Sequence, residues 1–180
     1  MRKSREEAAQ TRKRIVEAAS REFRNRGIVA TGINDLMKAA GLTHGGFYKH
    51  FESKDQLVAE AYAEAVDATV GAMSAHPTLG GVVAAYLSSG HRDDPASGCP
   101  LAAIGSELSR ADETTRAAVT AGFERLVGVL AGKSDAEDAR RRALVTVSTM
   151  IGALTLSRVV SDPELSAEIL SEVGKSLANG

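Results

Sequence analysis

The segment TGINDLMKAAGLTHGGFYKHFESK, residues 31–54, contains two helical patterns separated by a tight turn. Its first half places apolar side chains on one face at helical spacing, which predicts a helix over residues 33–40. Gly41 follows, and glycine ends helices readily because it adopts the left-handed conformation without a Cβ penalty. A second helix is expected from His44, with Thr43 as its N-cap. This arrangement is typical of a helix-turn-helix, whose second helix enters the DNA major groove.

The second helix has an unusual composition for a purely structural element. Gly45 and Gly46 together cost about 1–2 kcal/mol relative to alanines in a helix interior. Such a pair is favourable where the backbone must approach another surface, and the residues that follow bring a phenol, an ammonium and an imidazole to the same edge. The candidate DNA-contacting residues are Thr31, Thr43, His44, Gly45, Gly46, Tyr48, Lys49, His50 and Lys54.

Two phenylalanines and a new helix complete this segment. Phe47 and Phe51 are four residues apart and are expected to point inward. Ser53 is the expected cap of a long helix, and Lys54 lies in its first turn. Free amides at a helix N-terminus, together with one lysine, form a phosphate-binding position.

These residues resemble the DNA-binding domain of the tetracycline-repressor (TetR) family of one-component bacterial regulators. Two positions depart from the family pattern. Gly32 stands where the family usually has a capping hydroxyl, a change that costs little. Gly46 replaces a residue with a side chain and leaves fewer groups for reading bases. The residues that match the pattern are Ala40, Gly41, Leu42, Thr43, Gly45, Phe47, Tyr48, His50, Phe51, Lys54 and Leu57.

Charge is distributed unevenly along the 180 residues. The net charge of −1 conceals 12 Lys/Arg against 6 Asp/Glu in residues 1–54, a net of +6, and 10 against 17 in residues 55–180, a net of −7. Only the first third suits a polyanion such as DNA. Residues 1–14 are polar and contain no apolar signal-peptide core, so we expect a cytoplasmic protein, associated with the bacterial nucleoid when bound to DNA. Residues 1–5 are expected to form a frayed tail, with a minor-groove arm as the alternative.

Helical periodicity continues through the rest of the chain, and no window alternates with period two. The expected fold is all-α with about nine helices: an N-terminal three-helix helix-turn-helix domain, residues 1–56, and a C-terminal helical domain for effector binding and dimerisation, residues 57–180. Residues 90–98 are expected to form a loop. The predicted helices cover residues 6–25, 33–40, a short stretch from 44, 53–73, 79–89, 99–110, 113–130, 135–160 and 163–177.

The last two predicted helices carry apolar stripes that have two interpretations. The stripes could pack within their own subunit, or they could form a dimer interface. A helix-turn-helix regulator needs a dimer to span two half-sites, and the resemblance implies dimerisation through the last two helices as a four-helix bundle. We therefore expect a homodimer. The interface candidates are Leu144, Val147, Ile151, Leu154, Ile169 and Val173.

The resemblance also implies an effector pocket among the middle helices. Few aromatic residues and many alanines suggest a modest apolar cavity with few polar anchors. Any candidate lining residue could equally belong to the ordinary core. The candidates are Tyr62, Met73, Tyr86, Leu87, Ile104, Leu108, Phe123 and Leu126.

Catalytic and metal-binding patterns are not found. His91, Asp93, Asp94 and Cys99 are close in sequence, but their spacing fits no chelating pattern, so we expect no metal, cofactor or enzymatic activity. Cys99 lies at an expected helix start, where free amides favour a reactive thiolate, yet most free cysteines are small buried hydrophobes. We expect the packed role and keep Cys99 as a possible sensor.

The expected function is sequence-specific regulation of transcription by a repressor that a small apolar effector releases from a palindromic double-stranded operator. Two alternatives remain: a thiol-reactive DNA-binding sensor that acts through Cys99, and an architectural DNA-binding protein without an effector. No segment long and apolar enough to cross a membrane is expected.

Overall fold

A computed structural model describes residues 2–134 and 136–179, and every regular element in these residues is helical. The predicted all-α fold is confirmed. The expected count of about nine compares with nine α-helices and one short 3₁₀-helix, η1, in the described part of the chain. In chain order these are α1 (Arg2–Arg26), α2 (Ile33–Ala39), η1 (His44–Lys49), α3 (Lys54–Ala75), α4 (Leu79–Tyr86), α5 (Ser89–Asp93), α6 (Pro100–Leu108), α7 (Glu113–Ala131), α8 (Ala139–Val159) and α9 (Pro163–Asn179).

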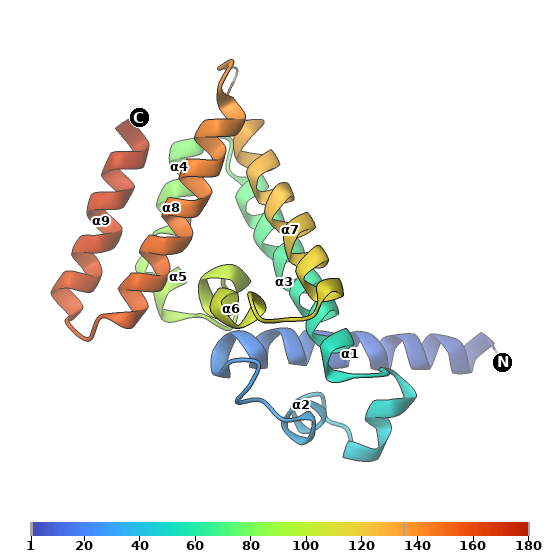
Figure 1. Cartoon of the computed structure of the whole chain (residues 1–180). Coiled ribbons are helices and arrows are strands. Elements are labelled where there is room, and N and C mark those ends of the chain that lie inside the picture. Colours follow the sequence, from blue (N-terminus) through green and yellow to red (C-terminus); the bar gives the residue numbers. More distant parts are fainter. Residues whose placement is uncertain (1, 135, 180) are drawn as a thin grey trace.

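Helix α1 runs along one edge of the molecule, and the helix-turn-helix lies against it (Figure 1). Ile15, Ala19 and Phe23 form its buried face, as their spacing predicts. The sequence predicts a helix from residue 6 and a frayed tail before it; in the structure α1 begins four residues earlier, at Arg2. Gly27 follows the helix with a φ of +87°, a value that favours glycine.

The helix-turn-helix closes around a small apolar core. Gly41 joins its two helices with a φ of +70°, the left-handed conformation that the sequence predicts. Leu36 and Met37 of α2 are buried, and so is Phe47 of η1. The rings of Phe47 and Phe51 stack with their centroids 5.6 Å apart, so both phenylalanines point inward as expected.

The second helix of the motif differs from the expected α-helix. Residues 44–49 form a 3₁₀-helix, in which the Gly46 amide donates to the Thr43 carbonyl at 3.1 Å. Two adjacent glycines weaken α-helical structure, which explains the tighter and shorter form. Thr43 is the N-cap residue, but its hydroxyl accepts no capping hydrogen bond. The expected role of the Thr43 side chain as a cap is therefore wrong, and this hydroxyl stays exposed.

The body is a layered set of helices above α1 (Figure 1). Helix α3 leaves the helix-turn-helix and runs beside α7, α8 packs on α7, and α9 packs on α8. The short helices α5 and α6 lie near the lower end of α8 in Figure 1, and α6 contacts α1, whereas α4 lies higher and packs on α9. Buried apolar residues form one continuous cluster from α1 to α9. Within residues 2–134 and 136–179, no helix has the length and apolar character needed to span a membrane.

Three predicted boundaries need correction. Helix α4 ends at Tyr86, and a separate helix, α5, occupies part of the stretch expected to be a loop. The Ser88 hydroxyl starts this helix by accepting a hydrogen bond from the His91 amide at 3.2 Å. Helix α8 begins at Ala139, four residues after the expected start at Asp135, which lies outside the described residues.

Candidate nucleic-acid interface and ligand cavity

One edge of η1 faces solvent, and it carries most of the candidate DNA-contacting side chains. Thr43, His44, Gly45 and Lys49 are exposed, and Tyr48 is 68% exposed. A Cβ atom added to Gly45 would meet nothing within 4 Å, so the backbone here is open to an approaching surface. This edge therefore combines hydrogen-bonding groups, positive charge and accessible backbone.

Two arginines of α1 hold this edge in place. Arg12 lies with its guanidinium 4.5 Å from the centroid of the Phe51 ring and donates to the His50 carbonyl at 3.3 Å. The same guanidinium forms a salt bridge with Glu60 of α3. Arg14 donates to the Ala40 carbonyl at 2.6 Å, at the turn between α2 and η1. The position of η1 thus depends on both α1 and α3.

Four candidate DNA-contacting residues are buried or half-buried. Thr31 is 0% exposed, and its hydroxyl donates to the Gly27 carbonyl at 2.6 Å. Because this side chain is buried, it cannot contact a phosphate, and the prediction that Thr31 contacts DNA is wrong. The half-buried Lys54 donates to the Ile28 carbonyl at 2.5 Å and so joins the start of α3 to the loop after α1. Gly46 and His50 are also half-buried.

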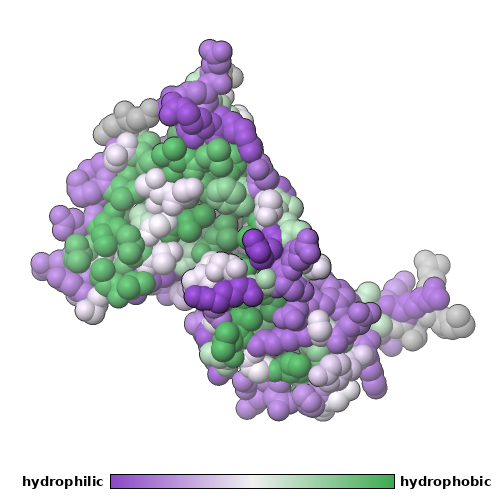
Figure 2. All heavy atoms as spheres, in the orientation of Figure 1, coloured by the Kyte–Doolittle hydropathy of each residue, from purple (hydrophilic) through white to green (hydrophobic). Residues whose placement is uncertain are grey.

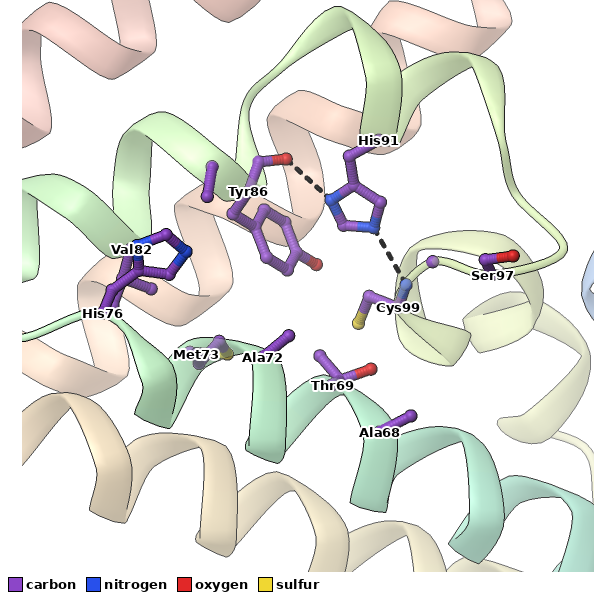
Figure 3. A pocket seen from close by; sticks show the side chains of 12 residues that line it. Ala68, Thr69, Ala72, Met73, His76, Val82, Tyr86, His91, Ser97 and Cys99 are labelled. Atoms are coloured by element: carbon purple, nitrogen blue, oxygen red, sulfur yellow. Dashed lines mark hydrogen bonds between the residues drawn. The ribbon is translucent and has the colours of Figure 1, made fainter.

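A cavity of about 170 Å³ lies between α3, α4 and the segment that precedes α6 (Figure 3). Met73 and Tyr86, two of the eight predicted ligand-lining residues, line it, and so does Cys99. Tyr62 and Ile104 border a narrow crevice against α1, whereas Leu87, Leu108 and Leu126 are buried in the core. The full lining is Ala68, Thr69, Ala72, Met73, His76, Val82, Ala85, Tyr86, His91, Ser97, Gly98 and Cys99.

The polar groups of this cavity are of two kinds. His91 is fully engaged, because its Nδ1 lies 2.7 Å from the Tyr86 carbonyl and its Nε2 accepts from the Cys99 amide at 2.9 Å. By contrast, the Tyr86 hydroxyl is buried and has no hydrogen bond of standard geometry in the described chain. Burial, with a smaller contribution from the Cys99 thiol, raises the pKa of Tyr86 well above its ordinary value, so the hydroxyl keeps its proton.

A second, more open groove of about 660 Å³ lies between α6, α7 and α8. Phe123, another predicted ligand-lining residue, borders it from α7. Ile151, predicted to lie in the dimer interface, borders it from α8. The groove is therefore next to the outer face of α8.

Comparison with known proteins agrees with this geometry. Residues 15–61 match the family described as "Bacterial regulatory proteins, tetR family", and residues 78–171, just over half of the chain, match "Transcriptional regulator LmrA/YxaF-like, C-terminal domain". The chain is 31% identical over 166 residues to the regulator Rv0196 of Mycobacterium tuberculosis, covering 84% of this chain and 86% of that protein. The chain belongs to the TetR family.

Two further proteins are similar to this TetR-family chain, one over part of its sequence and one over its whole fold. The regulator TtgR of Pseudomonas putida is 45% identical over 58 residues, which cover 32% of this chain and 28% of TtgR. The match to that curated relative thus spans less than a third of its length. The crystal structure of a TetR regulator from Chloroflexus aurantiacus superposes with a TM-score of 0.76 at 29% identity and covers 99% of this chain and 96% of that one.

The candidate dimer residues of this TetR-family chain divide into buried and accessible sets. Val147 and Leu154 lie in the core of the subunit, which leaves them no surface for a partner. Leu144, Ile151, Ile169 and Val173 are half-buried. Figure 2 shows hydrophobic surface over α8 and α9 on the face turned to the viewer. The exposed large apolar side chains of these two helices are Val145, Leu156, Val159 and Leu165, and none of these four is among the predicted interface residues.

Cys99 has the surroundings of a packed residue. It is 1% exposed, and burial raises the pKa of its thiol despite the Tyr86 hydroxyl and the amides of Ala102 and Leu101, which act in the opposite direction. The amides at the start of the helix therefore do not compensate for the removal of the thiol from water. These observations support the packed role that the sequence favours.

Two contacts between α1 with its following loop and the segment around α6 carry no local sequence signal. Arg24 of α1 is buried and donates to the Gly98 carbonyl at 2.8 Å, beside the cavity. Glu107, near the end of α6, accepts hydrogen bonds from the amides of Ile28 at 3.1 Å and Val29 at 2.8 Å. The cavity wall and α6 are thus bonded directly to α1 and to the loop that follows it.

His91 should make the stability of this TetR-family protein depend on pH. Burial lowers the pKa of His91; Arg158 acts in the same direction, whereas the bond to Tyr86 and the charge of Asp94 oppose the shift. Protonation of Nε2 would also remove the acceptor of the Cys99 amide. Below about pH 6.5, the ordinary pKa of histidine, the unfolded chain therefore binds more protons than the folded chain. The contribution of neutral His91 to stability is complete above that pH. It is lost as the pH falls from the ordinary pKa of histidine through the lowered pKa of His91.

We expect the urea midpoint of the wild type to fall between pH 7.5 and pH 5.5. His91→Gln should be less stable than the wild type at pH 7.5, because it loses the two hydrogen bonds of the imidazole ring. Its urea midpoint should fall less than that of the wild type on acidification. His44→Gln, a change at an exposed histidine, serves as the control and should keep the wild-type acid response. Equal acid losses in both variants would show that other groups dominate this window.

Proposed function

We propose that this protein is a dimeric transcriptional repressor that a small molecule releases from a palindromic operator. The exposed edge of η1 carries the proposal, because it presents polar and basic groups from a helix held rigidly by inward-pointing phenylalanines. Membership of the TetR family supports the same function. In this proposal residues 1–56 contact DNA and residues 57–180 contain the effector site and the dimer interface.

The proposed DNA contacts fall into two groups. His44 and Lys49 lie on the open side of η1, where side chains reach base edges in the major groove. The hydroxyls of Thr43 and Tyr48, the His50 side chain and the open backbone at Gly45 suit phosphates or sugars. Lys54 contributes mainly by holding the start of α3, where its remaining N–H groups extend the positive edge.

The proposed dimer forms through the outer face of α8 and α9. Leu156 and Val159 are 54% and 72% exposed on α8, a degree of exposure that favours a covering partner for large aliphatic side chains. A second copy of the chain is that partner, because two helix-turn-helix units must be held about one DNA turn apart.

The proposed release of DNA uses the helices and bonds that join the cavity to the helix-turn-helix. A ligand between α3 and α4 shifts α3, which begins at the edge of the helix-turn-helix. The same ligand acts on α1 through the bond between Gly98 and Arg24. Thermodynamic linkage then requires operator DNA to weaken ligand binding by the same factor.

The test is to select binding sites from a library of bacterial genomic DNA, including sequence upstream of the protein's own gene. We expect an inverted repeat. His44→Ala and Lys49→Ala should cost about 1–3 kcal/mol each on the selected site and relax the base preference at the contacted position. Lys175→Ala, at an exposed lysine of α9, is the matched control and should leave binding unchanged.

The readout is competition binding against single-base variants of the selected site. An architectural protein would bind all variants equally well. Uniform weakening by His44→Ala and Lys49→Ala across all sequences would likewise contradict base reading by η1.

A further inference from the structure

The cavity beside Tyr86 has the size of a single-ring molecule. Its volume is about 170 Å³, and an apolar cavity of about 150 Å³ in another protein holds benzene. Two fused or linked rings exceed this space unless the walls move. The exposed Ala68, Ala72 and Ala85 border the cavity and provide an entrance between α3 and α4.

The walls favour an uncharged ligand. Methyl and methylene groups of Ala72, Met73 and Val82 form most of the surface along α3 and α4. Among the described residues that line the cavity there is no Asp, Glu, Lys or Arg. A charged ligand would lose its hydration without gaining an ion pair.

One buried polar group of the cavity lacks a strong partner. The Tyr86 hydroxyl points toward the space near Thr69 and Cys99 in Figure 3, and it has no hydrogen bond of standard geometry in the described chain. The Cys99 thiol, a weak acceptor, is the one side chain that interacts with it as a hydrogen-bond partner among the described residues. The other neighbours of this hydroxyl are already engaged, because Thr69 donates to the Ala65 carbonyl at 2.9 Å and both ring nitrogens of His91 are bonded. A buried hydroxyl without a strong partner is destabilising, and an acceptor in the cavity would relieve this.

We infer that the effector is an uncharged, single-ring molecule with one acceptor oxygen, which receives a hydrogen bond from the Tyr86 hydroxyl. The cavity volume limits the ligand to one ring, and the apolar walls favour an uncharged molecule. The Tyr86 hydroxyl, as a donor, favours an acceptor such as a carbonyl, ether or hydroxyl oxygen. The inference rests on the proposed function only in treating this cavity as the effector site. The α6–α8 groove is the weaker candidate, because the described chain places no buried, unpartnered polar atom on its lining.

The test measures binding of three probes to the full chain by calorimetry: acetophenone, ethylbenzene and benzophenone. Acetophenone should bind about 3–10-fold more tightly than ethylbenzene, the gain of one buried hydrogen bond. Benzophenone, with two rings, should show no binding. Tyr86→Phe should abolish the difference between acetophenone and ethylbenzene.

The matched control is Tyr62→Phe. The Tyr62 hydroxyl already donates to the Val119 carbonyl at 3.3 Å, and this residue does not line the cavity. Its loss should leave the preference for acetophenone unchanged. Without ligand, Tyr86→Phe should raise Tm by about 2–4 °C because it removes a buried hydroxyl without a strong partner, whereas Tyr62→Phe should lower Tm.

Three outcomes overturn the inference: no binding of acetophenone, equal binding of acetophenone and ethylbenzene, or a preference that survives Tyr86→Phe. A separate operator-release assay tests the proposed function. Acetophenone that binds as expected but leaves operator affinity unchanged would refute the effector role of the cavity, while the ligand chemistry would stand.

Discussion

Operator affinity should fall about 10³–10⁵-fold when the salt concentration rises from 50 to 200 mM, as expected for a dimer that contacts about 6–10 phosphates. Each neutralised phosphate releases condensed counterions, and added salt weakens that driving force. The charge distribution favours this behaviour, because residues 1–54 carry 12 Lys/Arg against 6 Asp/Glu and residues 55–180 carry 10 against 17. Fluorescence anisotropy of a labelled operator across this salt range measures the slope.

A variant sharpens this prediction. Lys49→Ala should make the slope of log affinity against log salt shallower, because each copy of the chain loses one positive charge at the interface. Lys175→Ala, which removes a lysine in the last turns of α9, should leave the slope unchanged. A flat salt response of the wild type would contradict docking of η1 on the DNA backbone.

The double substitution Leu156→Asp with Val159→Asp should convert the dimer to a monomer and lower operator affinity about 10²–10⁴-fold. Charges at these two exposed positions of α8 would be buried against a like charge in the proposed dimer. A monomer binds one half-site and loses the effective concentration that connects two half-sites. Sedimentation velocity gives the oligomeric state, and anisotropy gives the affinity.

The matched control is Ala121→Asp, which introduces a charge at an exposed position of α7 that does not line the groove. It should remain dimeric and bind the operator normally. Substitution of the buried Leu154 by Asp is unsuitable, because a charge in the subunit core would unfold the chain and mimic loss of the dimer. An intact dimer in the double variant, with unchanged helix content, would place the interface elsewhere.

The helix-turn-helix is predictable from sequence because its determinants are local. Gly41 has the left-handed φ that its position predicts, and Phe47 and Phe51 point inward at the spacing of one helical turn. The 3₁₀ form of η1 is harder to foresee, because Gly45 and Gly46 weaken an α-helix without specifying its replacement. Helix α5 is not predicted because Gly90 and Pro95 resemble loop residues, whereas the capping hydroxyl of Ser88 starts a short helix, Ser89–Asp93, that includes Gly90.

The cavity and the links between domains depend on residues distant in sequence, and no local pattern reveals them. Tyr86 was expected among eight candidates by position in the chain, but the lack of a strong partner for its hydroxyl follows only from the packing of α3, α4 and the segment before α6. Lys54 was expected to seat a phosphate, yet the Ile28 carbonyl lies within its reach after folding. Charge and position in sequence indicate which partners a residue could bind, and packing decides which of them it contacts.

The bonds of Arg24 and Glu107 also bear on how the molecule unfolds. If residues 1–56 were released alone, the guanidinium of Arg24 would lose the Gly98 carbonyl, and the amides of Ile28 and Val29 would lose the Glu107 carboxylate. The apolar cluster that extends from α1 to α9 would be divided at the same time. We therefore expect the two regions to unfold as one cooperative unit, because melting of either region exposes the core of the other.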